Sequence, residues 1–168
     1  MNQAEQQQRF EQWTTEHRAI LHHVVNAFAE IGDRADLMQD VLLAVWKAIP
    51  AFRGGAQPTT FLYRVSHNTA MTWRRKRGNY QRLVNQAALE PQTSAGDRTR
   101  EQQLEQLYAR IRQFPPLDRS LLLLSLDEVS YREMAEIHGI AENLVGVRLT
   151  RARAKLIEQM KEEIHEHQ

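Results

Sequence analysis

The chain has 168 residues, of which 42% are hydrophobic and 26% are charged, and its formal net charge is +1. This balance is typical of a globular protein and excludes a disordered chain, and the length allows one domain or two small ones. The absence of cysteine excludes disulfides, thiolate metal sites and cysteine nucleophiles. No apolar run approaches the roughly 20 residues of a membrane span, and the polar start is unlike a signal peptide. We therefore expect no membrane insertion and a cytoplasmic location.

The first predicted helix begins near Phe10 and ends near Gly32. Its apolar residues recur every three or four positions, which is the spacing of one buried helix face. Gly32 is placed to end this helix, because glycine readily takes the left-handed conformation of a helix C-cap. The apolar residues of this face are Phe10, Trp13, Ile20, Leu21, Val24, Val25, Phe28 and Ile31.

A second helix is predicted to open at Asp33 and Asp36 and to run to Pro50. Asp36 and Gln39 have the spacing of a capping box, and the acids suit the positive end of the helix dipole. Apolar residues surround this helix almost completely, so nearly every side of it has to be covered. A small domain of three or four helices leaves one flank open, and we expect a partner protein there. The alternative is a central helix enclosed by its own domain.

The third predicted helix spans residues 59–77 and follows a loop with two glycines between prolines. One of its faces is apolar, whereas the other mixes aromatic rings, an amide and guanidinium groups. Such groups stack on the bases and follow the phosphates of single-stranded nucleic acid. Residues 52–89 carry seven basic and no acidic side chains, which supports contact with a polyanion. The alternative is a solvated helix whose basic end complements its dipole.

The C-terminal part of the chain shows the pattern of a helix-turn-helix motif. Helical spacing returns at Leu104, and Pro115 and Pro116 separate this helix from a leucine-rich one. A capping box beginning at Ser130 then opens a short helix, a turn at Gly139 follows, and the next helix is rich in arginine. We therefore predict an all-α fold of two small helical domains, 1–77 and 104–168, joined by a flexible linker, 78–103.

Taken together, these segments resemble the extracytoplasmic-function (ECF) group of bacterial RNA polymerase sigma factors, which have only regions 2 and 4. The resemblance covers roughly residues 10–77 and 104–160. It rests on the acidic helix opening at 33–41, on Phe52-Arg53-Gly54 with the segment 61–70, and on the motifs between residues 121 and 156.

The resemblance implies an alternative sigma factor with three interfaces and no catalytic residues, cofactor or metal. Core RNA polymerase and promoter DNA are the implied partners, together with an anti-sigma factor or another regulatory protein. The residues implied for core polymerase are Asp36, Leu37, Gln39, Asp40, Leu43, Trp46 and Lys47. Those implied for the minus-10 element are Arg53, Gly54, Tyr63, His67, Asn68, Arg74, Arg75, Lys76 and Arg77. Those implied for the minus-35 element are Asn143, Val147, Arg148, Arg151, Arg153 and Lys155.

The chain departs from the family pattern inside the recognition helix. Gly146 and Val147 stand where the family usually has a polar or basic pair, and neither side chain can make a bidentate contact to guanine. Ala141 replaces the usual Ser or Thr N-cap, and Ala35 replaces the second acid of the polymerase-binding helix. We expect weak minus-35 discrimination, with the basic side chains mainly contacting phosphates.

Other function classes fit the sequence less well. A helix-turn-helix regulator acting without polymerase would bind a palindromic duplex. A third class is a regulated protein that only sequesters polymerase or another partner. Such a protein would tolerate Gly146 in place of a polar or basic residue of the recognition helix. An enzyme is the least favoured class, because no paired acids, metal spacing or phosphate loop occurs. The seven histidines lack the spacing of a zinc site and are expected at the surface.

Overall fold

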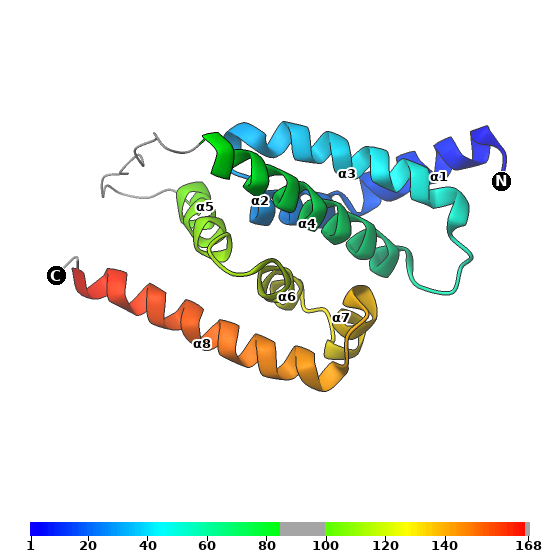
Figure 1. Cartoon of the computed structure of the whole chain (residues 1–168). Helices are drawn as coiled ribbons and strands as arrows, with labels where there is room; N and C mark the ends of the chain where they lie inside the picture. Colours follow the sequence, from blue (N-terminus) through cyan, green and yellow to red (C-terminus); the bar gives the residue numbers. More distant parts are fainter. Residues whose placement is uncertain (85–99, 167–168) are drawn as a thin grey trace.

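The computed structural model describes residues 1–84 and 100–166, and every regular element in these ranges is a helix (Figure 1). Helices α1 to α4 form the N-terminal half and α5 to α8 the C-terminal half, which confirms the all-α fold of two helical modules. Most of the predicted linker lies outside the described residues. No described helix is both long and apolar enough to cross a membrane. The helices are α1 (Gln3–Glu16), α2 (Arg18–Phe28), α3 (Arg34–Ala48), α4 (Pro58–Val84), α5 (Arg100–Ile111), α6 (Pro116–Leu126), α7 (Tyr131–His138) and α8 (Glu142–Glu166), with the 3-10 turns η1 (Ile31–Asp33) and η2 (Ile49–Ala51) on either side of α3.

The first predicted helix proves to be two helices that share one apolar side. The chain bends at His17, whose backbone has φ −112° and ψ 28°, so α1 ends and α2 begins there. The apolar periodicity continues through the bend because both helices face the same core. The placement of a C-cap at Gly32 was wrong, since α2 ends at Phe28 and Ala29 caps it in an extended conformation.

Two boundaries of the following helices also differ from the prediction. Helix α3 begins at Arg34, and neither Asp36 nor Gln39 forms the predicted capping box, because these residues lie inside the first turns rather than before them. Helix α4 continues to Val84, through Gly78, instead of ending at Arg77. One glycine costs a helix only about 1 kcal/mol, which the neighbouring turns can offset.

The helix-turn-helix segment follows the sequence closely. Pro116 occupies the first turn of α6, and four consecutive leucines of that helix, residues 121–124, are buried. The Ser130 hydroxyl accepts a hydrogen bond from the Glu133 backbone, and the Glu133 carboxylate accepts one from the Ser130 backbone. Gly139 ends α7 in the left-handed conformation with φ 63°, which glycine adopts without a Cβ clash. These predictions are confirmed.

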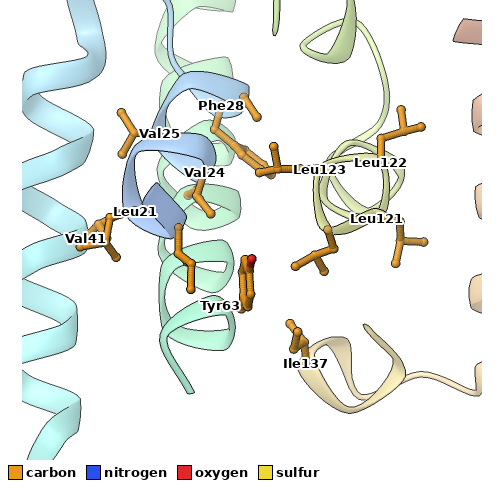
Figure 2. Close-up of a cluster of buried hydrophobic side chains, with 14 of the residues drawn as sticks. Leu21, Val24, Val25, Phe28, Val41, Tyr63, Leu121, Leu122, Leu123 and Ile137 are labelled. Atoms are coloured by element: carbon orange, nitrogen blue, oxygen red, sulfur yellow. The ribbon is translucent and has the colours of Figure 1, made fainter. Parts of the chain in front are cut away.

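The two halves pack on each other through one continuous apolar core. Helix α2 lies against α5 and α6, and α4 lies against α7. Figure 2 shows Phe28 of α2 and Leu123 of α6 directed toward each other, with Tyr63 of α4 between the N-terminal helices and Ile137 of α7. Phe28, Leu123 and Ile137 are each at most 3% exposed. This packing covers one face of α4. Of the α4 residues expected to contact DNA, those on the other face therefore remain accessible.

Candidate functional site

One face of α3 remains uncovered by the rest of the molecule. Its opposite face is core, since Leu37, Val41 and Val45 have no exposed surface. The uncovered face carries an apolar side chain among charges, and Leu43 is 50% exposed. The alternative of a wholly enclosed helix is therefore wrong. The exposed residues at helical spacing on this face are Asp36, Gln39, Asp40, Leu43 and Lys47.

Two residues expected at the polymerase interface have contacts within the N-terminal half. Leu37 points into the core and has no surface to offer a partner. Trp46 is half-buried, with its ring edge-to-face against Phe10 at a centroid distance of 5.4 Å, and its backbone carbonyl accepts a hydrogen bond from Gln6. The spacing of residues along a helix does not show which of its sides faces the core and which faces solvent. For this reason Leu37 was included among the residues expected to contact polymerase.

The loop before α4 and the outer face of α4 present the polar residues expected to contact the minus-10 element. Arg53 and Gly54 are exposed in the loop, and Gly54 has φ 75°, a conformation that side chains disfavour. Asn68, Arg75 and Lys76 are exposed on the helix. These five residues are accessible to nucleic acid in the structure as it stands.

Tyr63 and His67 were expected to contact unstacked bases, and in this arrangement both side chains are buried. They are 6% and 0% exposed, because the face of α4 that bears them is covered by α6 and α7. Burial and a hydrogen bond to Asp127 raise the pKa of Tyr63. Burial, with a smaller contribution from His138, lowers the pKa of His67 well below its usual value. In this arrangement neither side chain can contact DNA.

A polar cluster of buried His67 and Ser120 with half-buried His138 joins α4 to α6 and α7. The Ser120 hydroxyl contacts Nδ1 of His67 and, at 2.8 Å, Nε2 of His138. The two imidazole rings meet edge-to-face with centroids 5.6 Å apart. Burial lowers the pKa of His138 to about 4, so both rings are neutral at pH 7. The expectation of incidental surface histidines was wrong for these two.

Asp127, directly after α6, binds two side chains of the N-terminal half. The Tyr63 hydroxyl donates to Oδ2 of Asp127 at 2.8 Å, and Nδ1 of His23 lies 2.8 Å from Oδ1. This hydrogen bond raises the pKa of His23. The sequence offered no signal for these contacts, since an acid after a helix is ordinary and its partners lie 64 and 104 residues away.

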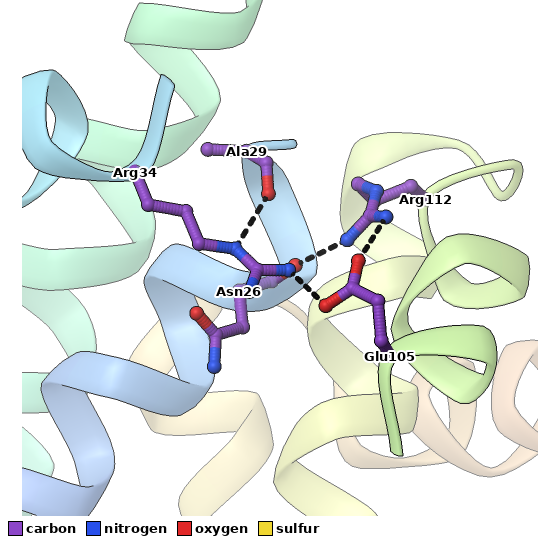
Figure 3. Close-up of polar contacts among 5 residues, drawn as sticks. All are labelled: Asn26, Ala29, Arg34, Glu105 and Arg112. Carbon is purple, nitrogen blue, oxygen red and sulfur yellow. Dashed lines mark hydrogen bonds and ion pairs between the residues drawn. The ribbon is translucent and has the colours of Figure 1, made fainter. Parts of the chain in front are cut away.

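One ion pair and a hydrogen bond to the backbone join the halves at the other end of their interface (Figure 3). Glu105 of α5 accepts hydrogen bonds from Arg34 of α3 and, at 2.7 Å, from Arg112. Arg112 also donates to the backbone carbonyl of Asn26 at 2.8 Å, and Arg34 donates to that of Ala29 at 3.3 Å. These two arginines hold the pKa of Glu105 below its usual value, although its burial acts in the opposite direction.

The recognition helix α8 exposes most of the residues expected to contact the minus-35 element. Val147 is 49% exposed, and Arg151, Arg153, Lys155 and Asn143 are also on the surface.

Several basic side chains of α8 have contacts within the C-terminal half, since Arg153 donates to the Tyr131 hydroxyl at 3.4 Å and Lys155 lies over the Phe114 ring. Arg148 donates to Asp118 of α6 at 2.7 Å, so it is less available for a phosphate than predicted. Gly146 lies beneath Tyr131, where an added Cβ would be 3.6 Å from the ring. That distance is an ordinary contact, so packing does not require glycine at this position.

The family of the chain follows from two matches in consecutive segments. The family model described as Sigma-70 region 2 matches residues 8–80, and the model described as Sigma-70, region 4 matches residues 104–156. The chain belongs to the sigma-70 family. Together the matches cover most of this sigma factor, in the order that the sequence resemblance implies, and they support a role in directing transcription initiation.

Curated relatives of this sigma factor are named as RNA polymerase sigma factors and match it along most of their length. It is 26% identical over 152 residues to RNA polymerase sigma factor YlaC of Bacillus subtilis (strain 168), a match that spans 86% of this chain and 87% of that protein. It is 27% identical over 143 residues to the ECF RNA polymerase sigma-E factor of Escherichia coli (strain K12), which spans 77% and 75% of the two chains.

Two solved structures share the fold of this sigma factor. The sigma factor RpoE in complex with the anti-sigma factor NepR from Bartonella quintana superposes with a TM-score of 0.73 at 22% identity, covering 91% of this chain and 97% of that one. CnrH in complex with the cytosolic domain of CnrY gives a TM-score of 0.65 at 21% identity, covering 92% and 89%. Both neighbours are therefore recorded in complex with a second protein, which for RpoE is an anti-sigma factor.

Proposed function

We propose that this sigma factor rests in a closed state, in which its C-terminal domain (104–168) covers part of the promoter-binding face of its N-terminal domain (1–77). The single observation that carries the proposal is the burial of Tyr63 and His67 on the same helix that exposes Asn68, Arg75 and Lys76. A helix that binds an unstacked DNA strand needs both its aromatic and its polar side chains to be accessible to that strand. Opening the domain interface would restore the complete face.

In this proposal core polymerase binds the uncovered face of α3, which remains accessible in the closed state. Leu43 supplies exposed apolar area, and Asp36 and Asp40 supply charge beside it. Polymerase can therefore bind first and draw the two domains apart onto its own surface. Promoter opening then needs no ATP, because binding energy holds the captured base outside the stack.

An anti-sigma factor or another regulatory protein is the second proposed partner. The structural neighbour RpoE was solved with the anti-sigma factor NepR, and CnrH was solved with the cytosolic domain of CnrY. A partner of this kind would keep this sigma factor inactive until a signal removes it.

Copurification with core polymerase, followed by run-off transcription from a candidate promoter, tests the proposed function directly. The sigma factor alone should bind promoter DNA weakly, and the holoenzyme should initiate at a defined start. Tight binding of a palindromic duplex without polymerase would instead favour a conventional helix-turn-helix regulator.

Leu43→Asp should weaken binding to core polymerase without unfolding the protein. Half of the leucine is already exposed, so the free protein loses little, whereas an interface would have to bury a new carboxylate. We expect a loss of about tenfold or more in affinity, measured by competition for labelled core polymerase. Ile157→Asp is the matched control, since Ile157 is 52% exposed on α8, outside the α3 face. Equal losses for both variants would refute this interface.

Asn68→Ala should reduce promoter opening and leave core binding intact. The exposed amide of Asn68 is placed beside the basic end of α4 and can hydrogen-bond a captured base. Removing that contact should cost roughly 1–2 kcal/mol, or about tenfold in the extent of opening. Fluorescence of 2-aminopurine in the minus-10 element reports the opening. A parallel loss of core binding would contradict the assignment.

A further inference from the structure

A cleft between the two domains gathers four arginines around a small volume. It encloses about 270 Å³ and lies at the end of the domain interface where α4 passes close to α5 and α6. Its apolar wall consists of Phe28, Trp73 and Ala109, and two acids, Glu30 and Asp33, lie at its edge. Its basic residues are Arg74 and Arg77 from the N-terminal domain and Arg112 and Arg119 from the C-terminal domain.

Arg119 is a buried cation with unused hydrogen-bonding capacity. The residue is 2% exposed, and its Nη2 donates to the backbone carbonyls of Arg112 and Phe114. Its guanidinium lies over the ring of Phe28, 5.0 Å from the centroid. Its Nε and Nη1 are buried and have no hydrogen-bond partner. Buried charges are normally paired, so these two donors remain available to an anion.

The neighbouring arginines do not neutralise Arg119. Burial, together with the charges of Arg74 and Arg112, lowers the pKa of Arg119 to about 10. The acids near the cleft are already engaged, because Asp33 pairs with Arg77 and Glu105 pairs with Arg34 and Arg112. Glu30 also lines the cleft and is exposed. The cleft therefore holds four arginines against two acids, and one of these acids, Asp33, is paired with Arg77.

We propose that this cleft binds a small phosphate-bearing molecule, held between Arg74 of the N-terminal domain and Arg119 of the C-terminal domain. Arginine forks match phosphate oxygens, and several guanidiniums can share one phosphate group. The volume lies just below the usual range of small-ligand sites, about 300–1,000 Å³, and is too small for duplex DNA. The phosphate group that binds belongs to free inorganic phosphate, to pyrophosphate or to a nucleotide.

Such a ligand would have a regulatory effect, which rests on the proposed closed state. It would bridge the two domains and occupy Arg74, a residue expected to contact the promoter. Binding would therefore favour the closed state and oppose promoter binding. The binding itself does not depend on the function and can be measured without DNA or polymerase.

Thermal unfolding of the full chain in phosphate, pyrophosphate or ADP tests the site, with chloride at matched ionic strength as the reference. We expect at least one phosphate compound to raise the melting temperature above the chloride value. Arg74→Gln should weaken that binding by about tenfold or more, the effect of losing one charge-assisted hydrogen bond. Arg75→Gln is the matched control, because Arg75 adjoins Arg74 on α4 and is exposed outside the cleft.

The outcomes separate cleanly. Stabilisation of the wild type and of Arg75→Gln, but not of Arg74→Gln, supports the site, and Arg119→Gln adds a second check if it folds. Equal stabilisation of the Arg74 and Arg75 variants, or no effect beyond chloride in any arm, overturns the proposal. The proposed transcription function would survive that result, because it rests on α3, α4 and α8 rather than on this cleft.

Discussion

Asp127→Ala is expected to shift this sigma factor from its closed to its open state and to increase its affinity for promoter DNA. The substitution removes the acceptor of two hydrogen bonds between the domains, from Tyr63 and from His23. It also leaves the Tyr63 hydroxyl buried without an acceptor in the closed state. Hydrogen bonds to a charged group contribute about 1.5–3 kcal/mol each, so losing both should lower the ratio of closed to open protein by at least about 100-fold.

The distance between the domains gives the direct readout. Because the chain has no cysteine, cysteines introduced at the exposed positions Gln12 and Glu158 can be labelled specifically with a fluorescent pair. The variant should show a longer mean distance, and promoter anisotropy should show tighter binding.

Asp118→Ala is the matched control for Asp127→Ala. Asp118 lies on α6 and pairs with Arg148 of the same domain, and its side chain is 19% exposed against 14% for Asp127. The Asp118→Ala substitution should leave the distance between the domains unchanged. If Asp127→Ala also leaves the distance and the promoter affinity unchanged, the closed state does not restrain DNA binding.

The sequence predicts the local structure of the C-terminal half well because its signals are short-range. The Ser130 capping box and the Gly139 turn each depend on residues at most four positions apart. Proline and glycine positions then place the helix-turn-helix almost to the residue. Failures occur where tertiary packing decides, as at His17, where two helices share one apolar face and no capping residue marks the break.

The sequence could predict which residues share one face of a helix, but not what packs against that face. The candidate site was predictable only to that extent. Asn68, Arg75 and Lys76 are exposed as expected, because a polar face remains polar wherever the helix packs. Tyr63 and His67 were assigned to DNA from the same helix, although they are amphipathic and suit a protein interface equally well. Their partners Ser120, Asp127 and His138 lie in the other domain, at separations that no local pattern encodes. Only the packing of the domains reveals them.

Acidification should open the same interface through the buried histidines. The closed state lowers the pKa of His138 to about 4, chiefly by burial, and that of His67 well below 6.5. Protons therefore prefer the open state, and the closed state loses stability as the pH falls below about 6.5. For His138 alone the loss at pH 5 is roughly 2 kcal/mol, and His67 adds to it.

The groups around the histidines determine how far this effect is offset. Among the residues that the structure describes, no side-chain acid is hydrogen-bonded to either ring, and the Ser120 hydroxyl is the polar partner of both. His23 acts in the opposite direction, because its pKa is raised by Asp127 and its contact strengthens as it is protonated. Its side chain is 39% exposed, so solvent screens this contribution, and the two buried rings should dominate.

The distance between the labelled domains, measured from pH 7.5 to pH 5, tests this expectation. The wild type should open progressively below about pH 6.5, with promoter binding by the free protein compared at the two ends of the range. His138→Gln should flatten the response, because glutamine can still hydrogen-bond Ser120 but does not titrate. His17→Gln, a change at the junction of α1 and α2, should retain the full response. A distance that stays constant down to pH 5, or an equal response in both variants, would show that the buried pair does not control the interface.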